Sequence, residues 1–168
     1  MTSTTRISVP AFDLAWLHLS DSTSFLLLVG GGGSAKTGVK NSIQIAKVGE
    51  KGLEVIQAYD TDINGKSCLC SSICTGIING KAVVCVGYDQ SCALLVAKKN
   101  DIDHSVKFDR VLDFEADFKA EDASVNCCCI VPTGHVVTGG DDGICRIWCV
   151  LNMFFVNPLL KRSYLFLH

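Results

Sequence analysis

A run of four glycines followed by a lysine and a threonine is the part of this sequence whose residue types could do the most chemistry. Residues 30–41 read GGGGSAKTGVKN and follow an apolar run at residues 25–29. Lys36 and Thr37 fit the end of the phosphate-binding pattern G-x-x-x-x-G-K-[ST], but Ala35 stands where that pattern needs its second glycine. The dinucleotide-binding fingerprint also fails, because no third glycine is correctly placed.

The residues after this glycine loop (residues 30–41) argue against phosphate binding as well. Both phosphate motifs need a following helix whose N-terminus holds the phosphate, whereas residues 41–46 alternate like a strand. A nucleotide-binding enzyme that uses Lys36 and Thr37 is therefore the weaker alternative. Glycines also let the backbone turn its carbonyls inward, which could hold a monovalent cation. The plainer interpretation is a hairpin loop with no ligand.

The cysteines are numerous but do not form a recognisable metal motif. Cys70 and Cys74 have the spacing of half a zinc site, yet no second pair partners them. Three consecutive cysteines at 127–129 point to alternate faces of a strand. We expect free thiols that act as small buried hydrophobes, since no secretory signal is visible at the N-terminus. The ten are Cys68, Cys70, Cys74, Cys85, Cys92, Cys127, Cys128, Cys129, Cys145 and Cys149.

The segment from Thr138 to Trp148 resembles the end of a WD repeat, in the form TGGxDGxxRIW. Asp and Gly residues make the tight turn between two strands, and Trp148 supplies a large apolar surface between blades. This explains Asp141 and Asp142 as turn residues and leaves little reason to assign them to a metal or catalytic pair. The resemblance identifies a fold and not a function.

The glycine loop, the cysteines and the WD-type segment must be positioned by strands, because apolar and polar residues alternate with a period of two along most of the chain. We predict an all-β, WD-repeat β-propeller that is incomplete, with about two and three-quarter blades. Corresponding turns recur at a spacing of roughly 50 residues, which is typical of four-stranded propeller blades. The expected units are blade 1 with the glycine loop (1–66), blade 2 (67–123), a partial blade 3 (124–150) and a divergent C-terminal tail (151–168). We expect the open edges of such a fragment to be sticky.

Composition excludes several classes of protein. The 168 residues carry a formal charge of −2 with a pI near 6.0, which lacks the basic footprint of a nucleic-acid binder. Hydrophobic residues make up 48%, so disorder over most of the chain is not expected. No apolar run reaches the roughly 18 residues of a membrane span. Taken alone, the chain is expected to be cytoplasmic.

The stretch LLLVGGGGSAKTGVKNSIQI, residues 26–45, resembles the first blade of the prolactin regulatory element-binding protein family. Members of that family are propeller-shaped guanine nucleotide exchange factors on the cytosolic face of the endoplasmic reticulum membrane. Their loop on blade one holds a potassium ion and engages the small GTPase that starts assembly of the COPII vesicle coat. The resemblance implies the same partner, cofactor and location here.

The resemblance also implies roles for individual residues. Potassium would be held by carbonyls of the glycine run and by the Asn41 side chain, and Val39 with Asn41 would make the exchange contacts to the GTPase. The implied potassium ligands are Gly30, Gly31, Gly32, Gly33 and Asn41. The implied partner-binding residues are Lys36, Thr37, Gly38, Val39 and Lys40.

Two departures from the family separate the hypotheses. The family has a complete propeller and a C-terminal transmembrane helix, and this chain is expected to lack both. The main hypothesis is an exchange factor, or a truncated form of one, for ER-to-Golgi transport, which would act without covalent chemistry. The alternative is a WD-repeat scaffold fragment in which the loop is only structural.

Overall fold

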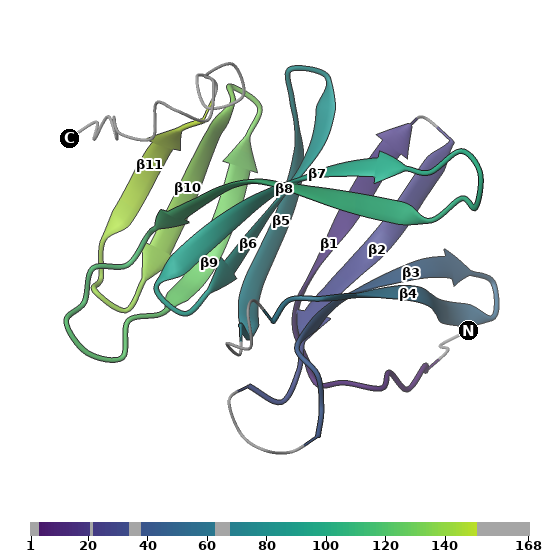
Figure 1. The fold of residues 1–168 in the computed structure, drawn as a ribbon, viewed down its shortest axis with the longest axis horizontal. Helices are drawn as coiled ribbons and strands as arrows, with labels where there is room; N and C mark the ends of the chain where they lie inside the picture. Colours follow the sequence, from purple (N-terminus) through teal and green to yellow (C-terminus); the bar gives the residue numbers. More distant parts are fainter. Residues whose placement is uncertain (1–3, 21, 34–37, 63–67, 151–168) are drawn as a thin grey trace.

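The fold consists of eleven strands in three antiparallel sheets that stand side by side like the blades of a fan (Figure 1). The computed structural model describes residues 4–20, 22–33, 38–62 and 68–150. No helix occurs in these ranges, so none of the described residues forms a helical membrane span. The all-β prediction is confirmed.

The first blade is a meander in the order β1-β2-β3-β4. Its centre is the apolar run of β2, where every residue from Phe25 to Gly30 is buried. Alternate side chains of this run pack into the core shared with blade two on one face and into a smaller apolar cluster on the other. The glycine loop joins β2 to β3, and a short turn joins β3 to β4. The strands are β1 (Ala11–Ser20), β2 (Thr23–Gly30), β3 (Ser42–Gly49) and β4 (Gly52–Asp60).

The second blade repeats this meander as β5-β6-β7-β8. Asn79 and Gly80 both have positive φ, 51° and 71°, as the two-residue turn between β5 and β6 requires. The strands are β5 (Cys70–Ile78), β6 (Lys81–Tyr88), β7 (Ser91–Lys99) and β8 (Val106–Glu115).

The third blade has three strands in the order β11-β10-β9. Trp148 is buried and packs against Phe114 of blade two, with the ring centroids 4.8 Å apart and the ring planes tilted by 51°. Its indole Nε1–H donates to Thr138 Oγ1 at 2.9 Å. The WD-type ending thus forms the expected contact between blades. The strands are β9 (Val125–Val131), β10 (His135–Gly140) and β11 (Cys145–Cys149).

Asp141 and Asp142 serve the turn between β10 and β11. Asp142 Oδ1 accepts a hydrogen bond from the Ile144 N–H at 2.9 Å, and its Oδ2 pairs with Arg146 at 2.7 Å. Asp141 accepts from the Asn126 side chain at 2.5 Å. The two carboxylates therefore have structural partners and do not face each other as a catalytic pair.

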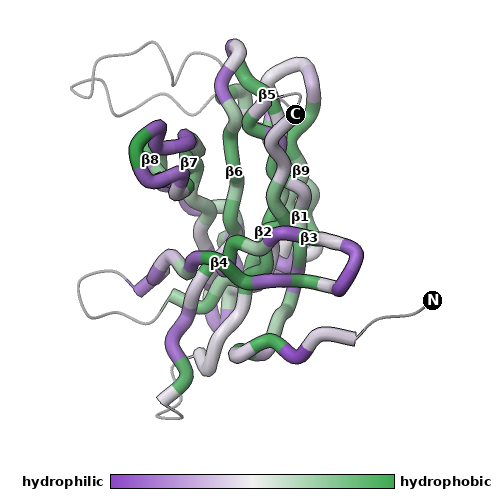
Figure 2. Tube along the Cα trace, turned by 90° about the vertical axis from the view of Figure 1, so that its right-hand side faces the viewer, coloured by the Kyte–Doolittle hydropathy of each residue, from purple (hydrophilic) through white to green (hydrophobic). Residues whose placement is uncertain are grey.

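The blades pack through their first strands, because β5 contacts both β1 and β9. One apolar core lies between blades one and two and includes Leu27, Ile43, Val84 and Leu95. A second lies between blades two and three and includes Val83, Cys85, Leu94 and Trp148. Figure 2 shows β6, which contributes to both cores, as hydrophobic over most of its length.

Among the described residues, no further blade covers the outer face of blade one. Phe12, Leu14 and Trp16 alternate along β1 on that face and are each about half exposed, while Leu17, on the other side, is fully buried against blade two. A row of this kind is the surface that a further blade or a partner would cover. It is the open edge expected of an incomplete propeller.

Candidate functional site

The glycine loop leaves blade one at the end of the sheet where two other connections meet it. Gly31 N–H donates to the Pro10 carbonyl at 3.2 Å, and the Asn41 carbonyl accepts from Thr61 N–H at 3.1 Å. The N-terminal segment and the β4–β5 connection therefore flank the base of the loop. Its residues 31–33 and 38–41 are described, whereas Lys36 and Thr37 lie outside the described residues.

Asn41 closes the base of the loop with its side chain. It is 1% exposed, and its Oδ1 accepts from Gly33 N–H at 2.9 Å while its Nδ2 reaches the Gly33 carbonyl at 3.4 Å. Its Nδ2 also donates to Asp62 Oδ1 at 2.9 Å. A buried amide with partners on both of its polar atoms holds the two ends of the loop at a set distance.

The hydrogen bonds of the Asn41 side chain to Gly33 and Asp62 are called the Asn41 clamp. Asp62 links this clamp to the connection between blades one and two. Its Oδ1 accepts from the Cys68 N–H at 3.0 Å as well as from Asn41. The neighbouring Thr61, which is buried, donates its hydroxyl to the Cys68 carbonyl at 2.8 Å. The loop of blade one is thus tied to the start of blade two. Asp62 and Thr61 belong to no sequence motif, so their role could not be predicted from the sequence.

Two glycines are required by close backbone approach. A Cβ at Gly30 would come within 1.7 Å of the Pro10 carbonyl oxygen. A Cβ at Gly31, whose φ is 150°, would come within 2.4 Å of Asn41 Oδ1. The glycine run is therefore explained at its start by packing against the N-terminal segment and the Asn41 clamp.

The outer half of the described loop is more accessible. Gly38 and Lys40 are exposed, and Val39 is half-buried. Lys40 Nζ lies 3.7 Å from Asp60 Oδ2, but both side chains are mostly in solvent, so this ion pair contributes little to stability. The side of the loop that leads to Val39 is the one that a partner could reach.

The geometry of the glycine loop bears on whether it binds phosphate, potassium or a protein partner. Asn41 is followed directly by strand β3 and not by a helix, so the loop lacks the helix N-terminus that a phosphate-binding enzyme would use. Asn41 Oδ1 is bonded to the loop's own backbone. Potassium binding by Gly30, Gly31, Gly32, Gly33 and Asn41, and GTPase contacts by Lys36, Thr37, Gly38, Val39 and Lys40, stay predictions.

The half zinc site suggested by Cys70 and Cys74 is not formed. A β-bulge between Cys70 and Ser72 shifts the register of β5, so residues four apart no longer share a face. Cys70 packs in the core between blades one and two, and Cys74 packs against the core between blades two and three. All ten cysteines are free thiols.

We expect the clamp to weaken in acid. Hydrogen bonds from the Cys68 N–H and then the Asn41 amide lower the pKa of Asp62 from its ordinary 3.8. The pKa of Asp62 is therefore lower in the folded state than in the unfolded state. The contribution of its carboxylate to the free energy of unfolding is fully present above about pH 5 and is lost as the pH falls through the folded pKa. The unfolding free energies of wild type and Asp62→Asn should differ above pH 5 and converge below pH 3.8, measured by urea titration. A difference that does not change with pH would contradict this.

Comparison with known proteins supports the fold. No protein-family model and no curated protein matches the chain. Among solved structures, Sqt1 from Chaetomium thermophilum matches with a TM-score of 0.59 at 15% identity. Chaetomium thermophilum Sqt1 bound to the N-terminus of ribosomal protein L10 matches with a TM-score of 0.61 at 14% identity.

These matches cover 95% of this chain but only 36% and 38% of the Sqt1 chains. The chain thus spans little more than a third of the length of the structures that it resembles. Identity at this level shows the fold alone. Together with the three blades and the Trp148–Thr138 contact, it shows an incomplete WD-repeat β-propeller.

Proposed function

We propose that this chain is a protein-interaction module of the WD-repeat type, and that the glycine loop is its partner-binding element. The observation that carries the proposal is the Asn41 clamp, which is buried and bonded to Gly33 and Asp62. A base that is held in this way restricts the conformations of the described loop residues on both sides of it, which lowers the entropy cost of binding. Sqt1 in complex with a ribosomal protein N-terminus illustrates that a fold of this kind can bind a protein segment.

A finer proposal concerns the partner. The resemblance of residues 26–45 to the prolactin regulatory element-binding protein family favours the small GTPase of the COPII coat, at the cytosolic face of the endoplasmic reticulum membrane. The chain, or a longer protein that contains it, would then act as a guanine nucleotide exchange factor. Such a factor binds the nucleotide-free GTPase more tightly than the GDP-bound form, so that GDP leaves by differential affinity and no bond is made or broken.

In this finer proposal each part of the loop has a task. Val39 would press an apolar side chain on the GTPase near its nucleotide, while Lys36, Thr37, Gly38 and Lys40 would contact the surface around it. A potassium ion held by carbonyls of Gly30–Gly33 would keep the charge-poor turn in one shape. Asn41 would support that shape from below through its bonds to Gly33.

GDP release in potassium and in lithium buffers separates the two proposals. If the chain is an exchange factor, it should accelerate release of a fluorescent GDP analogue from the COPII GTPase by at least about tenfold, and replacing potassium by lithium should remove most of this acceleration. Binding of the GTPase without acceleration would support the scaffold instead. Absence of both binding and acceleration would contradict the choice of this GTPase.

A further inference from the structure

Three cysteine side chains from two blades converge in the core between blades two and three. The sulfur atoms of Cys74, Cys85 and Cys128 all lie within 4.8 Å of one another. Cys74 of β5 and Cys85 of β6 are directly opposite in the strand register, and Cys128 enters from β9 of the next blade. Its Sγ lies 3.6 Å from the Cys85 carbonyl oxygen.

The spacing of these sulfurs is close to what a metal ion requires. Zinc binds thiolate sulfur at about 2.3 Å in tetrahedral geometry, which places two sulfur ligands about 3.8 Å apart. Sulfurs already within 4.8 Å can reach that separation by rotamer changes of about 1 Å. Cys92 of β7 adjoins Cys85 as a further thiol, but it lies outside this group of three.

A second observation points to a ligand at the same place. Ser72 is 1% exposed, and its Oγ has no hydrogen-bond partner of normal geometry. It precedes Cys74 by two residues on β5 and therefore lies on the same face. A buried hydroxyl that lacks a partner costs free energy, and an oxygen beside three sulfurs could fill the fourth position of a tetrahedral site.

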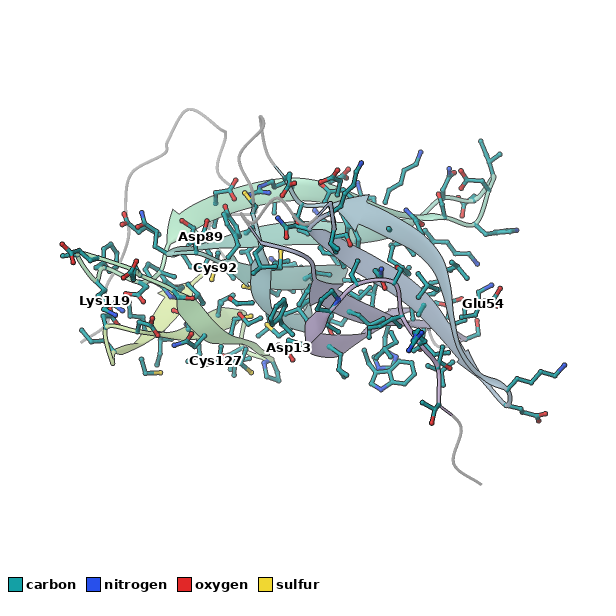
Figure 3. The ribbon with its side chains drawn as sticks, turned by 90° about the horizontal axis from the view of Figure 1, so that it is seen from below. Asp13, Glu54, Asp89, Cys92, Lys119 and Cys127 are labelled. Atoms are coloured by element: carbon teal, nitrogen blue, oxygen red, sulfur yellow. The ribbon has the colours of Figure 1, made fainter. Side chains whose placement is uncertain are left out.

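The local electrostatics agree with a cation. Asp13 of β1, labelled near the middle of the molecule in Figure 3, accepts a hydrogen bond from the Ile73 N–H at 2.9 Å and so places a carboxylate beside the strand that carries Cys74. A carboxylate near a group of sulfur ligands favours a cation at this place, and sulfur ligands suit zinc.

We propose that Cys74, Cys85 and Cys128 bind one zinc ion between blades two and three, with the Ser72 hydroxyl or a water molecule in the fourth position. Binding releases the protons of the coordinating thiols to solvent. The ion links β5 and β6 to β9 and so fastens the three-stranded third blade to the second. Within the described residues, such a link would stabilise the contact between blade two and blade three.

The test uses the complete 168-residue chain, purified with a reductant, stripped of metal with a chelator and titrated with zinc against a chromophoric zinc chelator. One zinc per chain is expected. Cobalt in place of zinc should give the intense near-ultraviolet absorption of sulfur-to-cobalt charge transfer. Zinc should also raise the melting temperature of the chain, because it binds the folded state.

Variants locate the site. Cys128→Ser should weaken zinc binding by at least about 100-fold, more than the tenfold to 100-fold typical of outer-shell changes. The matched control is Cys129→Ser, which alters the adjacent exposed thiol of the same strand and should leave the affinity unchanged. If Cys128→Ser fails to fold, the cobalt spectrum and the zinc-dependent melting shift of the wild type still decide.

Four outcomes would overturn the proposal. The first is that the chain binds no zinc at micromolar concentration, and the second is that Cys128→Ser and Cys129→Ser lose affinity equally. The third is that the chain binds copper(I) but not zinc. The fourth is that Cys74 and Cys85 form a disulfide that persists in the reduced, purified chain. One zinc per chain with a selective effect of Cys128→Ser would establish the site.

Discussion

Replacing Asp117 by alanine is expected to lower the free energy of unfolding by about 3 kcal/mol or more, which is a large part of the stability of a single domain. The carboxylate is fully buried. Its Oδ1 accepts from Lys119 N–H at 2.9 Å, and its Oδ2 accepts from Ser124 N–H at 3.0 Å and Asp141 N–H at 2.7 Å. Alanine would leave the N–H groups of Lys119 and Ser124 without this acceptor, and Asp141 N–H would keep only the Ser124 carbonyl at 3.1 Å.

The structural consequence follows from where these donors lie. Lys119 and Ser124 belong to the connection between blades two and three, and Asp141 begins the turn between β10 and β11. Asp117 thus ties the blade connection to the WD-type turn. Gly140 leaves the space for it, because a Cβ at that position would come within 2.6 Å of Asp117 Oδ2.

Urea unfolding followed by far-ultraviolet circular dichroism measures the effect. Glu121→Ala is the matched control, since Glu121 is an exposed acidic residue of the same connection and its loss should change stability by no more than about 0.5 kcal/mol. Asp117→Asn, which keeps one acceptor oxygen, should fall between the two. If Asp117→Ala lowered the free energy of unfolding by less than about 1 kcal/mol, the hydrogen bonds to the Asp117 carboxylate would not be important for folding.

Replacing Val39 by aspartate is expected to weaken partner binding at least about 30-fold, and to slow GDP release correspondingly if the partner is the COPII GTPase. The size follows from the roughly 2 kcal/mol or more of an interface hot spot, to which the burial of an unpaired carboxylate is added. The fold should persist, because Val39 lies in the loop beyond the Asn41 clamp and in neither inter-blade core.

Val48→Asp provides the control for this change. Val48 is about half exposed and lies near the other end of β3, by the turn to β4. The same substitution there alters charge and hydrophobicity equally but leaves the glycine loop untouched. Binding and exchange are measured by fluorescence of a labelled GTPase and by GDP release. Equal effects of the two variants, or no effect of Val39→Asp, would contradict a binding role for the loop.

Local signals in the sequence were sufficient to predict most of the fold. Period-two alternation and recurring turn residues indicated the strands, because both signals depend on residues that are close in the chain. The Thr138–Trp148 pattern indicated a blade, and the Trp148 Nε1–Thr138 Oγ1 bond confirms its structural meaning.

The candidate site was predictable only in part. The glycine loop stands out by composition, but the task of Asn41 depends on Asp62, which is 21 residues away in the next connection. The three-sulfur group was not predicted either. The β-bulge in β5 places Cys70 and Cys74 on opposite faces of the sheet. A bulge leaves no clear signal in a single sequence.

The amino-acid sequence by itself determined that this chain forms strands, where they turn, and that an unusual glycine loop interrupts the first blade, because these properties depend on neighbouring residues. Only the tertiary structure decided which polar and sulfur atoms meet. Asn41 with Asp62, Asp117 with Asp141, and Cys74 with Cys128 are brought together by strand register and blade packing, which depend on contacts between residues far apart in the chain.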